Sequence, residues 1–248
     1  MARSKKNNEM LVLPPAELEE ARKGIHANTL NFAKWVDEKG GVPDVDALIP
    51  FTRWITPLNV PRRFTTQMYV YFYPVSAPAT GALLKAGGKD ETALVATDDG
   101  GKEHTEAVFR SCEAWCNMAQ KGEVILFPPQ FYLIWLLGKF LQPSQGSVEE
   151  QRAKAREFLK GSGANGVPWA DKCISPQTIG MWQGRAVLDL SVPGPELKGS
   201  DRKGETGEVV LVKFSKEGPR EVNVRERKEV LDGMRRERAE KEAAKSKI

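Results

Sequence analysis

The spacing of apolar residues changes along the chain and predicts where helices and strands lie. Apolar residues recur at helical spacing from Pro15 to the glycine pair at 40–41, so one amphipathic helix is predicted there, opened by proline and ended by glycine. The preceding residues 1–13 are polar, and we expect them to be disordered. The chain is therefore predicted to begin its ordered structure with a helix.

Two strands are predicted next, over residues 49–57 and 64–73, with a proline-rich turn between them. In the second strand, Met68, Val70 and Phe72 alternate with residues that are also apolar or aromatic. A strand with two apolar faces is typical of the centre of a covered sheet. Residues 64–73 are therefore predicted to form a central strand.

The middle of the chain mixes short strands with helices. The predicted order is a Gly-rich loop over 76–91, strands over 92–97 and 103–111, a helix over 112–121, a strand or extended segment over 124–127, an apolar helix from Pro128 to Leu141, and an amphipathic helix over 147–160.

The pattern becomes that of an antiparallel meander after residue 168. Four strands separated by Gly/Pro turns are predicted at 177–182, 185–190, 208–214 and 220–224. A charged helix with Glu and Arg at i, i+3 and i+4 spacing follows over 226–245. Helices and strands together predict an α/β (α+β) fold with mixed-sheet and antiparallel parts.

Composition and charge narrow the classes of partner. The formal net charge is only +4, and the basic C-terminal helix interleaves Glu with Arg, so we expect no nucleic-acid partner. No run of about 18 apolar residues occurs, so no membrane partner is expected. A nucleic-acid-binding protein and a membrane-spanning protein are thus disfavoured.

The three cysteines are predicted to be free thiols in a reducing compartment. Cys112, Cys116 and Cys173 are odd in number and irregular in spacing. Cys112 and Cys116 could hold a metal only with ligands from elsewhere, and the chain has just two histidines. We therefore expect no metal at the cysteines.

Three stretches, in order, resemble the long Nudix hydrolases of the peroxisomal coenzyme A diphosphatase type. The first contains Trp54-Ile55-Thr56-Pro57 and then Arg62-Arg63-Phe64-Thr65-Thr66, similar to the Trp-x-Thr-Pro and Arg-Arg-Phe-Asp-Thr of that family. The second is the stretch from Glu103 to Phe109, followed by Glu113-Ala114, and it is similar to the family's Glu-leading strand and short helix. The third runs from Glu123 to Phe131 and resembles the family's Leu-x-Pro-Pro-Gln-Phe helix start.

The resemblance covers about residues 15–142 and implies how the chain is organised. It implies a partial Nudix mixed sheet with flanking helices over 1–145, a helical bridge and linker over 146–167, a β-rich appendage over 168–225 and a charged helical tail over 226–248. It also implies metal-dependent hydrolysis, with Mg²⁺ or Mn²⁺, of the diphosphate of a nucleotide or of (acyl-)coenzyme A.

The Nudix box itself, with its Arg-Glu and Glu-Glu core, is not found in the sequence. Its clustered carboxylates would hold the cations that offset charge on the diphosphate oxygens. The resemblance places the box just before residue 1, so we expect a truncated product, a mis-started gene model or a paralogue without the catalytic helix. We expect this chain to be inactive. The alternatives are a non-catalytic nucleotide- or CoA-binding regulatory module, or a gene fragment.

A missing strand and helix would leave a sheet edge uncovered, which favours self-association.

The resemblance carries four candidate site residues. Arg62 and Arg63 are candidates for binding phosphate, because guanidinium groups match phosphate oxygens; the alternative is a surface pair that caps a turn or forms a salt bridge with a nearby carboxylate. Glu103 is the candidate catalytic base or metal ligand, against a solvated strand end. Its neighbour His104 would point to the opposite face. Trp54 is a candidate for stacking on a ligand, although aromatic strand residues are more often core.

The last three residues, Ser246-Lys247-Ile248, differ by one conservative change from the Ser-Lys-Leu peroxisomal address. The alternative is a charged helix end in a cytoplasmic protein. A peroxisomal or a cytoplasmic location is therefore expected.

Overall fold

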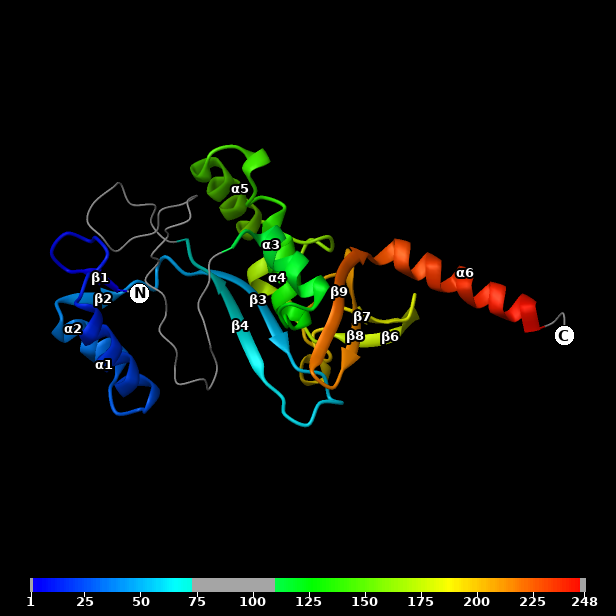
Figure 1. The fold of residues 1–248 in the computed structure, drawn as a ribbon, viewed down its shortest axis with the longest axis horizontal. Coiled ribbons are helices and arrows are strands. Elements are labelled where there is room, and N and C mark those ends of the chain that lie inside the picture. Colours follow the sequence, from blue (N-terminus) through cyan, green and yellow to red (C-terminus); the bar gives the residue numbers. More distant parts are fainter. Residues whose placement is uncertain (1, 73–109, 246–248) are drawn as a thin grey trace. The chain divides into compact units, whose positions relative to one another are not determined.

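The computed structural model describes residues 2–72 and 110–245 of the chain (Figure 1). It confirms the α+β class, with helices and both mixed and antiparallel sheets. By their contacts the described residues divide into two compact units, one that includes residues 2–48 and 71–72 and one that includes residues 49–70 and 110–245. These boundaries differ from the predicted division at 145 and 168, because strands from both sides of that division pair with each other in the second unit.

The described part of the first unit contains a two-stranded antiparallel sheet and two helices. Its strands are β1 (Ala2–Ser4) and β2 (Gly41–Pro43), and its helices are α1 (Pro15–His26) and α2 (Phe32–Glu38). The prediction of disorder is therefore wrong for residues 2–4. The prediction of one helix is also wrong, because Asn28 adopts a positive φ of 60° and Asn31 accepts a hydrogen bond from the Lys34 backbone as the cap of α2.

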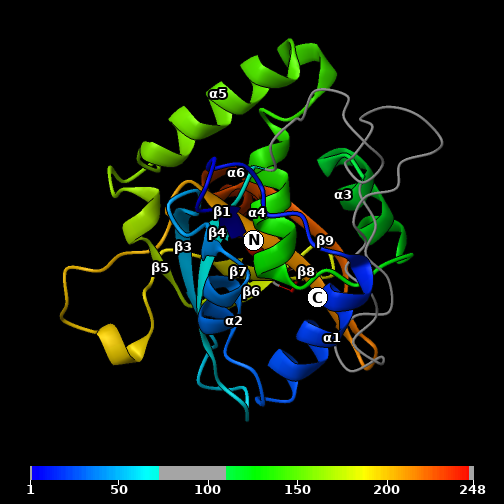
Figure 2. The ribbon, with the colours of Figure 1, turned by 90° about the vertical axis from the view of Figure 1, so that its left-hand side faces the viewer.

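The first sheet of the second unit is mixed. Its strand order is β4 (Thr65–Val70), β3 (Ile49–Ile55) and β5 (Cys173–Ile174), with β3 antiparallel to β4 and parallel to β5 (Figure 2). Among the described residues β4 is an edge strand, so its prediction as the central strand is wrong. The centre is β3, whose Phe51, Trp54 and Ile55 are buried.

The second sheet confirms the predicted meander. It runs in the order β6 (Gln177–Trp182), β7 (Arg185–Asp189), β8 (Glu208–Ser215) and β9 (Gly218–Glu226), all antiparallel. The final helix α6 (Arg227–Lys245) begins directly after β9 (Figure 1). Its Val230 and Met234 pack on Trp182 and on the buried apolar residues of the sheet. Gly233 allows this approach, because a Cβ there would lie 2.7 Å from the Trp182 indole nitrogen.

Three helices complete the second unit: α3 (Cys112–Lys121), α4 (Pro128–Gly138) and α5 (Val148–Lys160). All three were predicted. Residues 124–127, predicted as a strand or an extended segment, form no strand and lead directly into α4. Helices α3 and α4 pack against β9, whereas α5 packs against β3 and the single turn η2 (Trp169–Asp171). The rings of Phe51, Phe158 and Trp169 meet there with centroids 5.0–6.3 Å apart. The remaining single turns are η1 (Pro143–Gln145) and η3 (Pro195–Leu197).

The loop predicted over 76–91, the strand over 92–97 and all but the last two residues of the strand over 103–111 lie outside the described residues; residues 110–111 form no strand and lead into α3. None of the helices in the described part of the chain is long and apolar enough to cross a membrane.

Candidate functional site: an arginine-bearing turn

The predicted phosphate-binding arginines lie in the connection between β3 and β4, residues 56–64, which we call the arginine turn. Thr56 closes it: its backbone N–H donates to the Phe64 carbonyl at 3.0 Å, and its hydroxyl accepts from the Phe64 N–H at 3.0 Å. The prolines at 57 and 61 lack an N–H and keep the segment between these bonds out of the sheet ladder. The two strands therefore fix the base of the turn.

The two arginines have different environments. Arg63 is held by the protein, because its Nε donates to the Thr56 carbonyl at 2.9 Å and its guanidinium forms an ion pair with Glu196. Arg62 is exposed and has no ion pair with any residue that the structure describes. The alternative of a turn cap and a salt bridge thus describes Arg63, while Arg62 presents its charge to solvent.

Large apolar side chains lie exposed on the same turn. Leu58 and Phe64 each expose 65% of their surface, and Val60 exposes 39%. These three residues lie within four positions of Arg62 in the sequence, so the same turn presents apolar groups and a cation to solvent. Such a surface matches a ligand that carries both an anionic group and an apolar chain.

Trp54 lies in the core rather than in a ligand site. It exposes 4% of its surface, its ring lies 5.9 Å from that of Tyr132, and its indole N–H donates to the buried Thr52 hydroxyl at 2.9 Å. At this exposure the ring has no open face to stack on a ligand. The ligand-stacking role predicted for Trp54 does not fit this structure.

The candidate catalytic Glu103 and its neighbour His104 lie outside the described residues. Among the residues described, no three His, Cys, Asp or Glu side chains gather as metal ligands. Mg²⁺ binds oxygen ligands in octahedral geometry and releases its waters reluctantly, so separate carboxylates hold it weakly. The residues of the described regions do not fit the Mg²⁺ or Mn²⁺ site that the resemblance implies.

The three cysteines are free, as predicted. Cys112 and Cys116 lie half-buried on α3, and burial raises the pKa of both thiols, that of Cys116 to about 11. Cys173 is buried in β5. The raised pKa values of Cys112 and Cys116 favour neutral thiols over nucleophilic thiolates at these two positions.

A fully buried ion pair, which the sequence did not predict, joins Lys172 and Glu205. Lys172 Nζ lies 2.9 Å from Glu205 Oε2, and the two side chains expose 0% and 1% of their surface. Lys172 also donates to Asn165 Oδ1 at 2.6 Å and to the Gly204 carbonyl at 3.2 Å. The backbone N–H groups of Thr206 and Gly207 donate to Glu205 Oε1 at 2.8 and 2.7 Å.

Because both charges are compensated and enclosed, this pair joins two loops and cannot reach a substrate. Gly163 lies directly over it, since a Cβ there would be 1.9 Å from Glu205 Oε2. One feature of the sequence could have indicated this buried pair: Glu205 lies between Gly204 and Gly207. Glycines at such positions often allow a side chain or the backbone of another loop to approach closely.

A second polar contact links α4 to β8. The Tyr132 hydroxyl donates to Glu208 Oε2 at 3.2 Å, and burial raises the pKa of Tyr132 well above its ordinary value. Lys139 Nζ lies 3.9 Å above the Trp135 ring and 3.5 Å from Glu208. The Tyr132 phenol is buried and neutral, and the Glu208 carboxylate is already paired with Lys139. These groups therefore hold α4 on the sheet.

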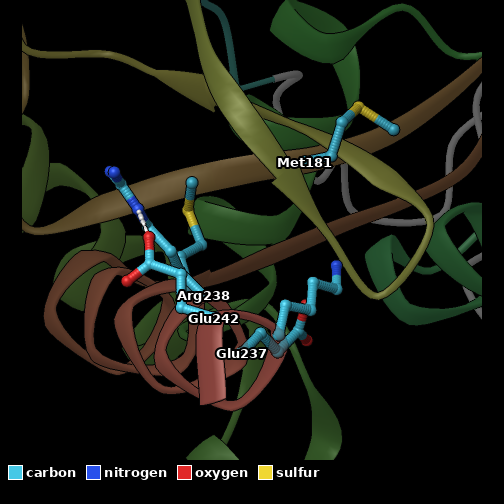
Figure 3. Close-up of a pocket in the computed structure, with 6 residues that line it drawn as sticks. Met181, Glu237, Arg238 and Glu242 are labelled. Carbon is cyan, nitrogen blue, oxygen red and sulfur yellow. Dashed lines mark hydrogen bonds and ion pairs between the residues drawn. The ribbon is translucent and has the colours of Figure 1, made fainter. Parts of the chain in front are cut away.

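A hollow of about 370 Å³ lies between the edge strand β6 and α6 (Figure 3). Met181 and Met234 supply its apolar lining, and Arg238 Nε donates to Glu242 Oε1 at 2.9 Å beside them. A second hollow of about 440 Å³, between the segment that follows α4 and helix α5, includes Phe140 and Phe158, whose rings are tilted at 33° with centroids 4.7 Å apart. Neither hollow contains the predicted site residues.

The comparisons with known proteins add no family. No family model, no curated protein and no solved structure matches the chain.

Proposed function

We propose that the chain is a Nudix-type protein that binds the diphosphate of a nucleotide or of a coenzyme A ester at the arginine turn. The observation that carries the proposal is the exposed Arg62 guanidinium on a turn fixed by Thr56 and Phe64. A guanidinium contacts two phosphate oxygens with charge-assisted hydrogen bonds. The ordered resemblance of three sequence stretches to the coenzyme A diphosphatases supports the same ligand class.

The apolar part of the turn favours an ester with an apolar chain over a free nucleotide. Leu58 and Phe64 are the most exposed large apolar residues of the turn, at 65% each. Burial of apolar surface contributes about 25 cal/mol per Å². A fatty acyl chain lying over these residues would add to the contact that Arg62 makes with the diphosphate.

We further propose that this polypeptide does not hydrolyse the bound diphosphate. Its sequence has no Nudix box, and the carboxylates in the described regions do not gather into a site for divalent cations. Charge that develops on the leaving phosphate would then lack the metal that offsets it in such hydrolases.

Incubation of the 248-residue chain with an acyl-CoA and Mg²⁺, followed by mass spectrometry, tests this inactivity. We expect intact acyl-CoA. Appearance of the two phosphate monoesters from cleavage of the diphosphate, at a rate proportional to protein concentration, would overturn the inactivity. A matching assay of the Arg62→Ala variant would then tell whether the turn takes part.

A further inference from the structure

The ion pair between Arg63 and Glu196 joins the arginine turn to a distant part of the chain. Glu196 belongs to the single turn η3 in the connection between β7 and β8, residues 190–207. Both side chains keep contact with solvent, with 28% of Arg63 and 43% of Glu196 exposed. The Glu196 carboxylate thus contacts the Arg63 guanidinium in the way that a phosphate group would.

The base of this connection is fixed. Glu205 N–H donates to the Leu190 carbonyl at 2.8 Å, and Gly204 N–H donates to the Ser191 carbonyl at 3.0 Å. The buried Lys172–Glu205 pair lies at the same point. These contacts set where the connection leaves and re-enters the sheet.

The part of the connection that carries Glu196 is more exposed than its base. Gly194 and Gly199, at φ values of 101° and 86°, flank η3, and Pro195 and Lys198 between them are exposed. An ion pair that keeps contact with solvent contributes little to stability, so a ligand phosphate can replace the Glu196 carboxylate at small cost. The fixed base and the exposed end together make Glu196 a displaceable partner of Arg63.

We propose that Glu196 is an intramolecular competitor that occupies Arg63 until an anionic ligand displaces it. The inference rests on the proposed function, since it concerns the same turn. In the free protein Arg62 is the available cation, and Arg63 becomes the second one only when Glu196 leaves. The bound state then has two guanidinium groups for the two phosphates of a diphosphate.

The test measures binding of inorganic pyrophosphate to the full chain by isothermal titration calorimetry. Glu196→Gln removes the competing charge and is expected to tighten binding about two- to fivefold, the equivalent of an exposed ion pair. Glu240→Gln, on the exposed part of α6, makes the same change in net charge and is expected to leave the affinity unchanged. Circular dichroism checks that both variants are folded.

The tighter pyrophosphate binding of Glu196→Gln must also depend on Arg63. We expect Arg63→Ala and the double variant Arg63→Ala/Glu196→Gln to bind with equal affinity. Equal affinity of wild type and Glu196→Gln, an equal gain in Glu240→Gln, or a gain that survives Arg63→Ala would overturn the competitor role while leaving the proposed function intact. Absence of binding in both wild type and Glu196→Gln would overturn the proposed function itself.

Discussion

Lys172 and Glu205 form an ion pair that is removed from solvent, with 0% and 1% of their side chains exposed and Nζ 2.9 Å from Oε2. Their remaining hydrogen-bonding groups are used by the loops around them, through Asn165, Gly204, Thr206 and Gly207. The attraction between the two charges offsets the free-energy cost of burying them. Removing one member leaves the other charge buried and unpaired, which destabilises the fold by far more than the intact pair stabilises it.

Glu205→Gln is predicted to destabilise the protein by about 3–5 kcal/mol, because the Lys172 ammonium stays buried without a counter-charge. Urea denaturation followed by tryptophan fluorescence measures this. Glu226→Gln, on the exposed end of β9, is the control and is expected to change stability by less than about 0.5 kcal/mol. Equal unfolding midpoints for the two variants would show that the pair is not buried as described.

Asp44 gives a pH dependence to the first unit. The Arg3 hydrogen bond and then that of Tyr71 outweigh burial and lower the pKa of Asp44, with Arg3 Nε at 2.8 Å and the Tyr71 hydroxyl at 2.7 Å. A lowered pKa stabilises the folded state above the ordinary carboxyl value near 4, and this stabilisation is lost as the pH falls through the folded-state pKa.

We therefore predict that wild type loses stability below pH 4 more steeply than Asp44→Asn, which starts less stable at pH 7. Thermal unfolding at pH 7, 4 and 3 measures the difference. Asp46→Asn changes an exposed neighbour and should follow wild type. A constant difference between wild type and Asp44→Asn from pH 7 to 3 would contradict the assignment.

The half-buried thiols of α3 should react slowly. Burial raises the pKa of Cys116 to about 11 and raises that of Cys112, and the thiolate is the nucleophile. Alkylation by iodoacetamide, followed by mass spectrometry, is predicted to be slow at pH 7.5 and to accelerate towards pH 11. The urea-unfolded chain, where all three cysteines react, is the control. Rapid labelling of Cys116 in the folded chain at pH 7.5 would rule out this environment.

Trp54→Phe separates a core role from a ligand role. The change removes the indole N–H that the buried Thr52 hydroxyl accepts at 2.9 Å, and we predict a loss of about 1–3 kcal/mol in unfolding free energy. Affinity for coenzyme A should stay within about twofold, as measured by calorimetry on the folded variant. Unchanged stability with a large loss of affinity would restore the stacking role.

The local elements were largely predictable, because each depends on residues close in sequence. The strands β6 to β9 and the helix α6 were predicted to within about two residues, since alternation and Gly/Pro turns define them. The break between α1 and α2 was missed because apolar spacing continues across Asn28, whose backbone leaves the helical region. Local signals at single asparagines are weaker than a long apolar pattern.

Long-range pairings could not be predicted. The two residues of β5 are too few to show a strand pattern, yet their pairing with β3 makes β3 the central strand and β4 an edge. A lysine and a glutamate are expected at the surface, so nothing local indicated that Lys172 and Glu205 are buried. The arginine turn was predicted as a candidate, but the pairing of Arg63 with Glu196 depends on the tertiary fold.

Calorimetric titration of coenzyme A onto wild type and Arg62→Ala, in buffer with Mg²⁺, tests most directly whether the exposed guanidinium holds the diphosphate. Saturable binding at one site is predicted for wild type, and binding at least about tenfold weaker for Arg62→Ala, because a hydrogen bond to a charged group contributes about 1.5–3 kcal/mol. Equal affinity of the two proteins, or no binding by wild type, would contradict it.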